Sequence, residues 1–248
     1  MIEVRQLNKS FGSHQILEEV SFQIEKGESV VILGRSGGGK SVLLKHLIGL
    51  LRPDSGHVLI EGEDIVRMNE RSLLRVRHKF GMLFQSAALF DSMTVEENVA
   101  FAFRQDRVIK PVEIGRKVAE VLDLVDLPGV GKKKPSELSG GMRKRVGLAR
   151  AIVDRPEIVL YDEPTTGLDP IVSDSIDRLI LRVRDHLDVT TVVVTHDMRT
   201  ARRCGQRIFL LHNKRIYATG TADEIFNSTD PILRQFVDGV SDPKEAIF

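Results

Sequence analysis

The stretch Gly34-Arg-Ser-Gly-Gly-Gly-Lys40-Ser41 matches the pattern G-x-x-x-x-G-K-[ST] at every fixed position. Its small residues allow a tight loop whose backbone N–H groups point inward at the phosphates of a nucleotide. In this pattern Lys40 neutralises β- and γ-phosphate oxygens, and Ser41 places its hydroxyl on Mg²⁺. The sequence therefore predicts a phosphate-binding loop, with Mg²⁺ as the cofactor.

The flanking sequence supplies the strand and the helix that such a loop requires. Residues 29–33 are a short, apolar and β-branched run, which predicts a buried strand. Residues 42–51 predict a helix whose positive N-terminal end faces the phosphates. Since strand, loop and helix agree, a plain glycine-rich turn explains the stretch less well.

The composition is that of an ordinary globular protein. A chain of 248 residues, 42% hydrophobic and 29% charged, can bury a large core in one domain with a subdomain. A net charge of +1 gives no reason to expect nucleic acid as a partner. The single cysteine, Cys204, excludes an intramolecular disulfide framework and fits a reducing compartment. We see no N-terminal signal and no apolar run near the ~20 residues that cross a bilayer, so any membrane-spanning part must come from other subunits.

The order of the expected elements indicates an α/β fold. Strands are predicted at 2–7, 16–24, 57–61, 79–84, 158–162, 191–195 and 207–211. Alternation with helices predicts a mostly parallel core sheet, joined by an N-terminal antiparallel β-subdomain. Helical patterns separated by prolines predict an inserted helical subdomain at 86–154, and a further helix is expected at 171–186. Residues 1–230 are expected to form the domain, and 231–248 a polar C-terminal tail.

A phosphate loop needs an acidic partner for Mg²⁺, and residues 158–163 provide one. The apolar run ends in Asp162, at the carboxyl end of a predicted buried strand, where ligands of parallel sheets bind. Asp162 is predicted to hold Mg²⁺, and Glu163 to orient and deprotonate the attacking water. The alternative, two acids in a solvated turn, is disfavoured by the phosphate loop upstream.

The stretch Leu138-Ser-Gly-Gly-Met142 indicates the class of nucleotide hydrolase. Two adjacent glycines precede a basic helix at 143–150 and create a second anion-binding helix N-terminus. Alone, such a turn is more often a simple helix cap. Here it lies within the predicted helical insertion, far from the phosphate loop in topology, so it is an anion site without a nucleotide of its own.

With these motifs in order, the chain resembles the ATP-binding-cassette (ABC) ATPases over nearly its whole length. The signature ends in Met142 rather than Gln, and the adenine-stacking position holds Phe rather than Tyr; neither change removes a phosphate ligand, and Phe keeps a stacking face. The matching residues, in family order, are the stacking residue Phe11; the Walker A residues Gly34, Arg35, Ser36, Gly37, Gly38, Gly39, Lys40 and Ser41, with Val42 after them; Gln85 of the Q-loop; Ser139, Gly140 and Gly141 of the signature; Asp162 and Glu163 of Walker B; Leu168 and Asp169 of the D-loop; and His196 of the H-loop.

The resemblance implies ATP hydrolysis by a head-to-tail homodimer that sandwiches two ATP molecules. Walker A of one chain would hold each ATP together with Ser139 and Gly141 of the other chain. Gly140 and Asp169 are also expected to bind the nucleotide.

The same resemblance implies the catalytic and metal-binding roles. Ser41, Asp162 and Gln85 would contact Mg²⁺, and Gln85 would also sense the γ-phosphate and pass that state to the helical subdomain. His196 would donate to the γ-phosphate and hold the attacking water in line, which makes Glu163 and His196 the catalytic residues.

A finer resemblance is to the Mla-type ATPases of phospholipid-trafficking transporters, which are associated with mammalian-cell-entry (MCE) proteins. It is carried by residues 84–90, the Leu-Ser-Gly-Gly-Met signature, and residues 143–150 and 161–170, although the usual form has Gly where Ala87 or Ala88 stands. It implies integral membrane permease subunits, an MCE-domain lipid-binding subunit, and a peripheral location on the cytoplasmic face of the inner (plasma) membrane. The alternative is the ATPase subunit of an amino-acid or other small-solute ABC importer.

Residues 86–93 lie where ABC transporters receive a coupling helix from the membrane subunit. The apolar residues of this segment are Ala87, Ala88, Leu89, Phe90 and Met93. If they are exposed, they form an interface; if they are buried, they pack the helical subdomain, and both interpretations stay open. A soluble ABC protein of DNA repair or translation is disfavoured because there is no long coiled-coil insertion and no tandem cassette. A scaffold with an inactive site is disfavoured because Glu163 and His196 are present.

Overall fold

The computed structural model describes residues 1–105 and 110–240. Its strands are β1 (Ile2–Phe11), β2 (His14–Ile24), β3 (Ser29–Gly34), β4 (Ser55–Ile60), β5 (Glu63–Asp64), β6 (Phe80–Leu83), β7 (Ile158–Asp162), β8 (Thr190–Thr195), β9 (Arg207–His212) and β10 (Arg215–Thr221). Its helices are α1 (Lys40–Leu47), α2 (Glu70–Arg77), α3 (Val95–Val99), α4 (Pro111–Leu124), α5 (Gly140–Ile152), α6 (Pro170–Leu187), α7 (Met198–Cys204), α8 (Ala222–Phe226) and α9 (Pro231–Asp238), with short 3₁₀ turns η1 (Ile65–Arg67), η2 (Ala100–Gln105) and η3 (Pro135–Glu137).

The central sheet is mostly parallel, as predicted. Within the described residues its strand order is β10-β9-β3-β8-β7-β6, and only the edge pair β9–β10 is antiparallel. Every residue of β3, β7 and β8 is buried. Continuous apolar strands are typical of a parallel sheet covered on both faces, which is why these runs were recognisable in the sequence.

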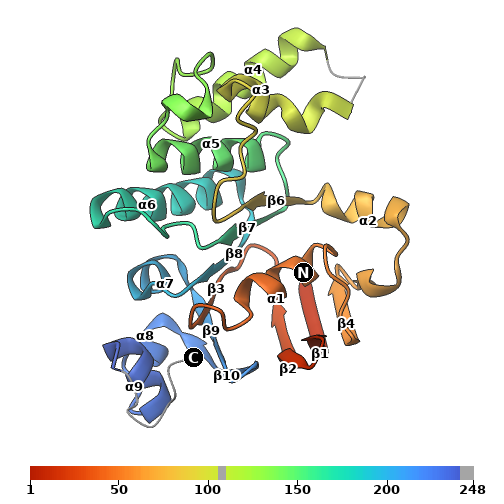
Figure 1. The fold of residues 1–248 in the computed structure, drawn as a ribbon, viewed down its shortest axis with the longest axis vertical. Helices are drawn as coiled ribbons and strands as arrows, with labels where there is room; N and C mark the ends of the chain where they lie inside the picture. Colours follow the sequence, from red (N-terminus) through yellow and green to blue (C-terminus); the bar gives the residue numbers. More distant parts are fainter. Residues whose placement is uncertain (106–109, 241–248) are drawn as a thin grey trace.

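A second, antiparallel sheet confirms the predicted N-terminal β-subdomain. Its order in the described part of the chain is β2-β1-β4-β5, and Ile2 of β1 pairs with both Ile24 and Ile60. Ile2, Val4 and Leu7 of β1 join one hydrophobic cluster with Leu43 and Leu47 of α1. Figure 1 shows this sheet beside α1, at the opposite end of the molecule from α3 and α4.

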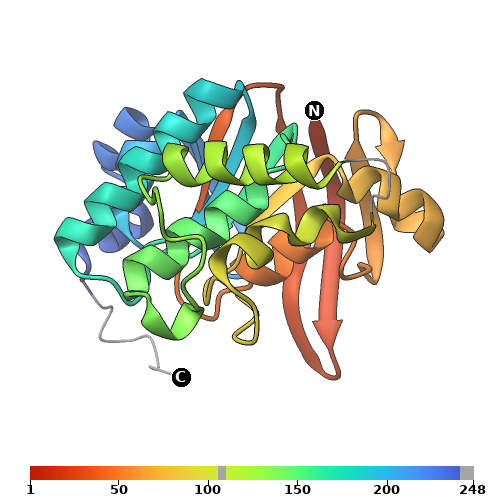
Figure 2. The same ribbon diagram turned by 90° about the horizontal axis from the view of Figure 1, so that it is seen from above.

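The described residues between 86 and 154 form helices and turns but no strand. Figures 1 and 2 show α5 lying between the layer of α3 and α4 and the long helix α6. The helix α5 also packs against β6 of the central sheet, so it bridges the helical layer and the sheet. None of the helices in the described ranges is long and apolar enough to span a bilayer.

The start of the expected C-terminal tail is a packed helix, α9. Asp230 caps it by accepting hydrogen bonds from the N–H groups of Ile232 and Leu233. Leu233 and Phe236 are buried in the main hydrophobic cluster. The sequence did not predict this helix, because its eight residues are too few for a clear helical repeat of apolar positions. Ile247 and Phe248, the last apolar residues expected in the tail, lie outside the described residues.

Candidate active site

The phosphate loop, residues 34–41, leaves the carboxyl end of β3 and enters α1. Gly37 and Gly39 have φ of 75° and 95°, a region that side chains disfavour. A Cβ on Gly39 would also lie 2.9 Å from the Ile16 side chain, and one on Gly34 would lie 2.7 Å from the Leu211 carbonyl oxygen. Backbone conformation therefore favours glycine at position 37, close packing favours it at position 34, and both favour it at position 39.

Lys40 curls back over this loop. Its Nζ donates to the carbonyl oxygens of Gly34 and Arg35, at 2.8 and 2.9 Å, and lies 3.1 Å from Oε1 of Glu163. The side chain of Lys40 is almost fully buried. Its charge is thus held at the mouth of the loop, where the sequence pattern expects phosphate oxygens.

Ser41 and Asp162 meet at the start of α1 and the end of β7. The hydroxyl of Ser41 donates to Oδ1 of Asp162 over 2.6 Å. Burial raises the pKa of Asp162, the hydrogen bond from Ser41 opposes that rise, and the neighbouring charge of Glu163 adds to it. A hydroxyl and a carboxylate at this separation are the oxygen ligands that Mg²⁺ prefers, so the residues present fit the predicted cation.

Glu163 is the centre of the site. Its φ is 48°, and its backbone N–H donates to the carbonyl of Val194, which anchors the turn to β8. Nδ1 of His196 lies 2.8 Å from its Oε2, and the hydroxyl of Thr166 donates to the same oxygen at 3.1 Å. The two residues predicted as catalytic are therefore in direct contact. Thr166 was not assigned a role from the sequence.

The charge of Glu163 results from opposing effects. Burial alone raises the pKa of Glu163, but the hydrogen bond to His196 and the charge of Lys40 outweigh it and hold the pKa below its ordinary value. The carboxylate is therefore ionised at neutral pH and oriented by its neighbours. Such a group can accept a proton from a water molecule placed against it.

These residues enclose a cavity of about 370 Å³ at the carboxyl edge of the sheet. The ring of Phe11, 49% exposed, stands at its rim with the ammonium of Lys9 5.4 Å from the ring centroid. Gln85 also lines the cavity, whereas Arg35 does not, and the guanidinium carbon of Arg35 lies 6.0 Å from the centroid of the Phe236 ring. The lining residues are Phe11, Ile16, Ser36, Gly37, Gly39, Lys40, Ser41, Val42, Gln85, Glu163, Thr166 and His196.

The predicted signature residues lie elsewhere. Ser139 caps α5, where its hydroxyl accepts from the N–H of Met142 at 3.3 Å. Asp169 caps α6 in the same way, and a Cβ on Gly141 would lie 2.6 Å from the Val172 side chain. The start of α5, which holds the signature, therefore packs against the start of α6, which follows the D-loop. The lining of the cavity around Lys40 includes none of the predicted residues Ser139, Gly140, Gly141 and Asp169.

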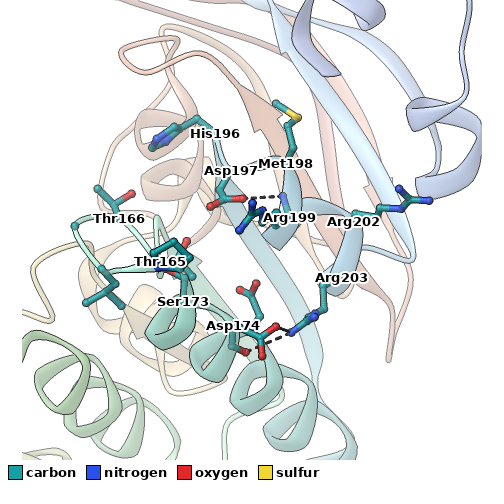
Figure 3. Close-up of a pocket in the computed structure, with 14 residues that line it drawn as sticks. Thr165, Thr166, Ser173, Asp174, His196, Asp197, Met198, Arg199, Arg202 and Arg203 are labelled. Atoms are coloured by element: carbon teal, nitrogen blue, oxygen red, sulfur yellow. Dashed lines mark hydrogen bonds and ion pairs between the residues drawn. The ribbon is translucent and has the colours of Figure 1, made fainter. Parts of the chain in front are cut away.

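A second cavity, of about 830 Å³, adjoins His196 between the start of α6 and helix α7 (Figure 3). Asp177 is buried at its base and accepts from the hydroxyl of Thr200 at 2.9 Å, and that hydroxyl lies 3.2 Å from the hydroxyl of Thr165. Burial raises the pKa of Asp177 to about 6. This chain of hydrogen bonds ties α6 and α7 to the segment that follows Glu163.

The segment after Gln85 divides between core and surface. Ala87 is buried and Leu89 packs against the hydrophobic cluster, whereas Phe90 is 40% exposed. Among the large apolar residues of this segment, Phe90 is exposed, whereas Leu89 and Met93 are half-buried. The centroid of the Phe90 ring lies 4.6 Å from that of the Phe101 ring. Both rings line a groove of about 620 Å³ between the sheet and the helical layer.

Comparison with known proteins shows the family of the chain. The family model described as ABC transporter matches residues 17–166. The probable ribonucleotide transport ATP-binding protein mkl of Mycobacterium leprae is 46% identical over 96% of this chain and 69% of its own length. A relative of the same name from Mycobacterium bovis is matched over 66% of its own length. The chain therefore spans about two thirds of the length of these relatives.

Two further matches cover nearly the whole of both partners. The intermembrane phospholipid transport system ATP-binding protein MlaF of Haemophilus influenzae is 39% identical over 98% of this chain and 92% of its own length. The dimeric ATP-binding cassette MJ0796, in a post-hydrolysis state bound to ADP and Pi, is 31% identical with a TM-score of 0.82, covering 90% of this chain and 99% of that one. Since the family model matches more than half of the sequence and relatives match nearly all of it, the chain belongs to the ABC transporter family and is an ATP-hydrolysing subunit.

Proposed function

We propose that this chain is the ATP-hydrolysing subunit of an ABC transporter that moves phospholipid across the cell envelope. The observation that supports phospholipid as the transported substrate is the 39% identity to the phospholipid transport protein MlaF, which extends over 98% of the chain. The observation that supports hydrolysis is the contact of Glu163 with His196 beside the paired oxygens of Ser41 and Asp162.

The residues of the cavity divide the work of hydrolysis. The loop amides of residues 34–41 and the ammonium of Lys40 bind the phosphates of ATP, while Phe11 stacks on the base. Ser41, Asp162 and Gln85 would hold Mg²⁺, and the ion would supply positive charge that offsets the charge of the ATP phosphates.

Two further residues act on the attacking water. Glu163 accepts a proton from that water as it attacks. His196 orients Glu163 and donates to the γ-phosphate.

We further propose a head-to-tail homodimer. Ser139, Gly140, Gly141 and Asp169 do not line the cavity of their own chain, and the structurally similar cassette MJ0796 is a dimer. In the proposed arrangement these residues of one copy complete the ATP site of the other. The backbone amides of Gly140 and Gly141 would then meet the γ-phosphate, as a helix N-terminus favours.

The membrane partner is proposed to be a pair of integral permease subunits. Exposed Phe90 and the groove beside it offer an apolar surface for them. The chain would then be peripheral, on the cytoplasmic face of the inner membrane, with residues 86–154 as the helical subdomain that carries the contact. The ATP-binding domain is proposed to be residues 1–230, onto which α9 of the following segment packs. An MCE-domain subunit is the proposed lipid-binding partner.

The cargo is tested by purifying the chain with its membrane partners in mild detergent. We expect an MCE-domain subunit in the complex, phospholipid in its extract by mass spectrometry, and ATP hydrolysis that phospholipid stimulates. A periplasmic solute-binding protein in its place, with hydrolysis stimulated by an amino acid or a ribonucleotide, would contradict the lipid proposal. The complex carrying Glu163→Gln provides the baseline without hydrolysis.

A further inference from the structure

Helix α5 places one charged side chain in the interior of the protein. Lys144, five residues after Ser139, is only 5% exposed. Its Nζ donates to two main-chain carbonyls, those of Gln85 and Glu163, the second at 3.1 Å. One lysine therefore touches both loops whose residues Gln85 and Glu163 line the cavity.

The loop after Gln85 lies close against the same helix. A Cβ on Gly147 would lie 3.1 Å from the Cβ of Ala87 and 3.3 Å from its carbonyl oxygen, so backbone and helix are in near contact. Arg150 donates to the carbonyls of Ala87 and Ala88, at 2.8 and 2.7 Å. These two alanines have φ of 61° and 47°, and the bonds from Arg150 hold that unfavourable conformation.

The surroundings of Lys144 make its two bonds necessary. Burial lowers the pKa of Lys144 to about 8, against the opposing charges of Asp162 and Glu163. A buried ammonium costs free energy unless its protons are hydrogen-bonded. The carbonyls of Gln85 and Glu163 meet that need, and they in turn are held in place by it.

We propose that Lys144 is a positioning residue that couples the two ATP sites of the dimer. This inference rests on the proposed head-to-tail function, in which Ser139 contacts the ATP bound by the partner. Lys144 follows on the same rigid helix about 7 Å along its axis. When α5 moves to engage the partner's ATP, Lys144 carries that movement to Gln85 and Glu163 at the ATP of its own chain.

The test is Lys144→Met in the full chain, which keeps the length of the side chain but loses the donors. We expect kcat to fall about tenfold or more, with KM and the Kd for ADP within about twofold of wild type. The Hill coefficient for ATP should fall from above one to about one, because the link between sites is cut. Lys144→Arg, which keeps charged donors, should recover both, and the exposed Lys133→Met should match wild type.

Several outcomes overturn the inference. One is a Lys144→Met dimer with wild-type kcat and Hill coefficient. Another is a variant that loses ADP affinity and thermal stability in step with kcat, since that describes a purely structural lysine. If Lys144→Met does not fold, Lys144→Gln replaces it, and wild-type kinetics in that variant also overturn the coupling. A wild-type chain that hydrolyses ATP as a monomer would instead contradict the proposed function.

Discussion

The ammonium of Lys40 lies 3.1 Å from Oε1 of Glu163, so the lysine expected to bind phosphate is paired with the carboxylate expected to act as base. Both side chains are buried, which makes the pair stronger than one at the surface. The charge of Lys40 helps to hold the pKa of Glu163 down. In the proposed mechanism Lys40 turns to phosphate oxygens, so that Glu163 loses this effect and becomes a stronger base.

Glu163→Gln should reduce kcat for ATP about 100-fold or more, because the amide keeps the shape of the side chain but cannot accept a proton. Binding of ATP should persist, since Lys40 is no longer paired with a carboxylate, and ATP-bound dimers should accumulate. Steady-state hydrolysis and size-exclusion chromatography with ATP measure the two effects. Glu113→Gln, the same change on the exposed surface of α4, is the control. A variant that turns over at near wild-type rate would remove Glu163 from the role of base.

Two substitutions test the two halves of the proposed ATP site, one half from the phosphate loop of one chain and the other from the signature of its partner. Lys40→Ala should weaken ATP binding to its own chain, whereas Ser139→Arg should leave binding to the monomer intact and block closure of the dimer. An equal mixture contains heterodimers with at most one intact site, so its hydrolysis should stay below about a quarter of wild type. Normal hydrolysis by Ser139→Arg alone would show that the head-to-tail arrangement is wrong.

Substitutions at neighbouring residues test the docking surface. Phe90→Asp should weaken assembly with the permease, because a charge would be desolvated at the contact, while the isolated chain keeps its melting temperature. Leu89→Asp should instead lower the melting temperature by roughly 5 °C or more, since Leu89 packs against the core. Thermal unfolding and a pull-down of the permease distinguish them. Early melting of Phe90→Asp, or its normal assembly, would argue against this surface.

Asp177 should make stability depend on pH. Its pKa is raised to about 6 in the folded chain, against ~3.9 in the unfolded chain. From about pH 4 to 6 the unfolded chain has lost a proton that the folded chain keeps, so stability falls as pH rises through this window.

Asp177→Asn removes this pH-dependent loss of stability, and its amide oxygen can still accept the hydrogen bond from the Thr200 hydroxyl. It should therefore be more stable than wild type at pH 7, by at most about 3 kcal/mol, and equal to it near pH 4. Thermal unfolding at both pH values measures this, with the exposed Asp123→Asn as the control. Equal destabilisation at both pH values would mean that the carboxylate serves packing alone.

Short elements were the hardest to anticipate. Helices α2 and α7 and strand β10 are seven or eight residues long, and β10 leaves no residue fully buried. Their formation depends on neighbours supplied by the rest of the chain rather than on a pattern of their own. Lys144 was missed for the same reason: its partners lie 59 and 19 residues away. Its place three residues before buried Gly147 on one face of α5 was the signal available.

The sequence by itself determined where the phosphate loop, the two acids and His196 lie in the fold, because each follows a buried apolar strand. The carboxyl ends of β3, β7 and β8 must meet at one edge of a parallel sheet, so these groups converge without further information. Only the tertiary structure decided that Leu89 is packed and Phe90 exposed, that Phe236 supports Arg35, and that Lys144 holds two distant carbonyls. These outcomes depend on which side chains are brought together from far along the chain, and local periodicity carries no record of those contacts.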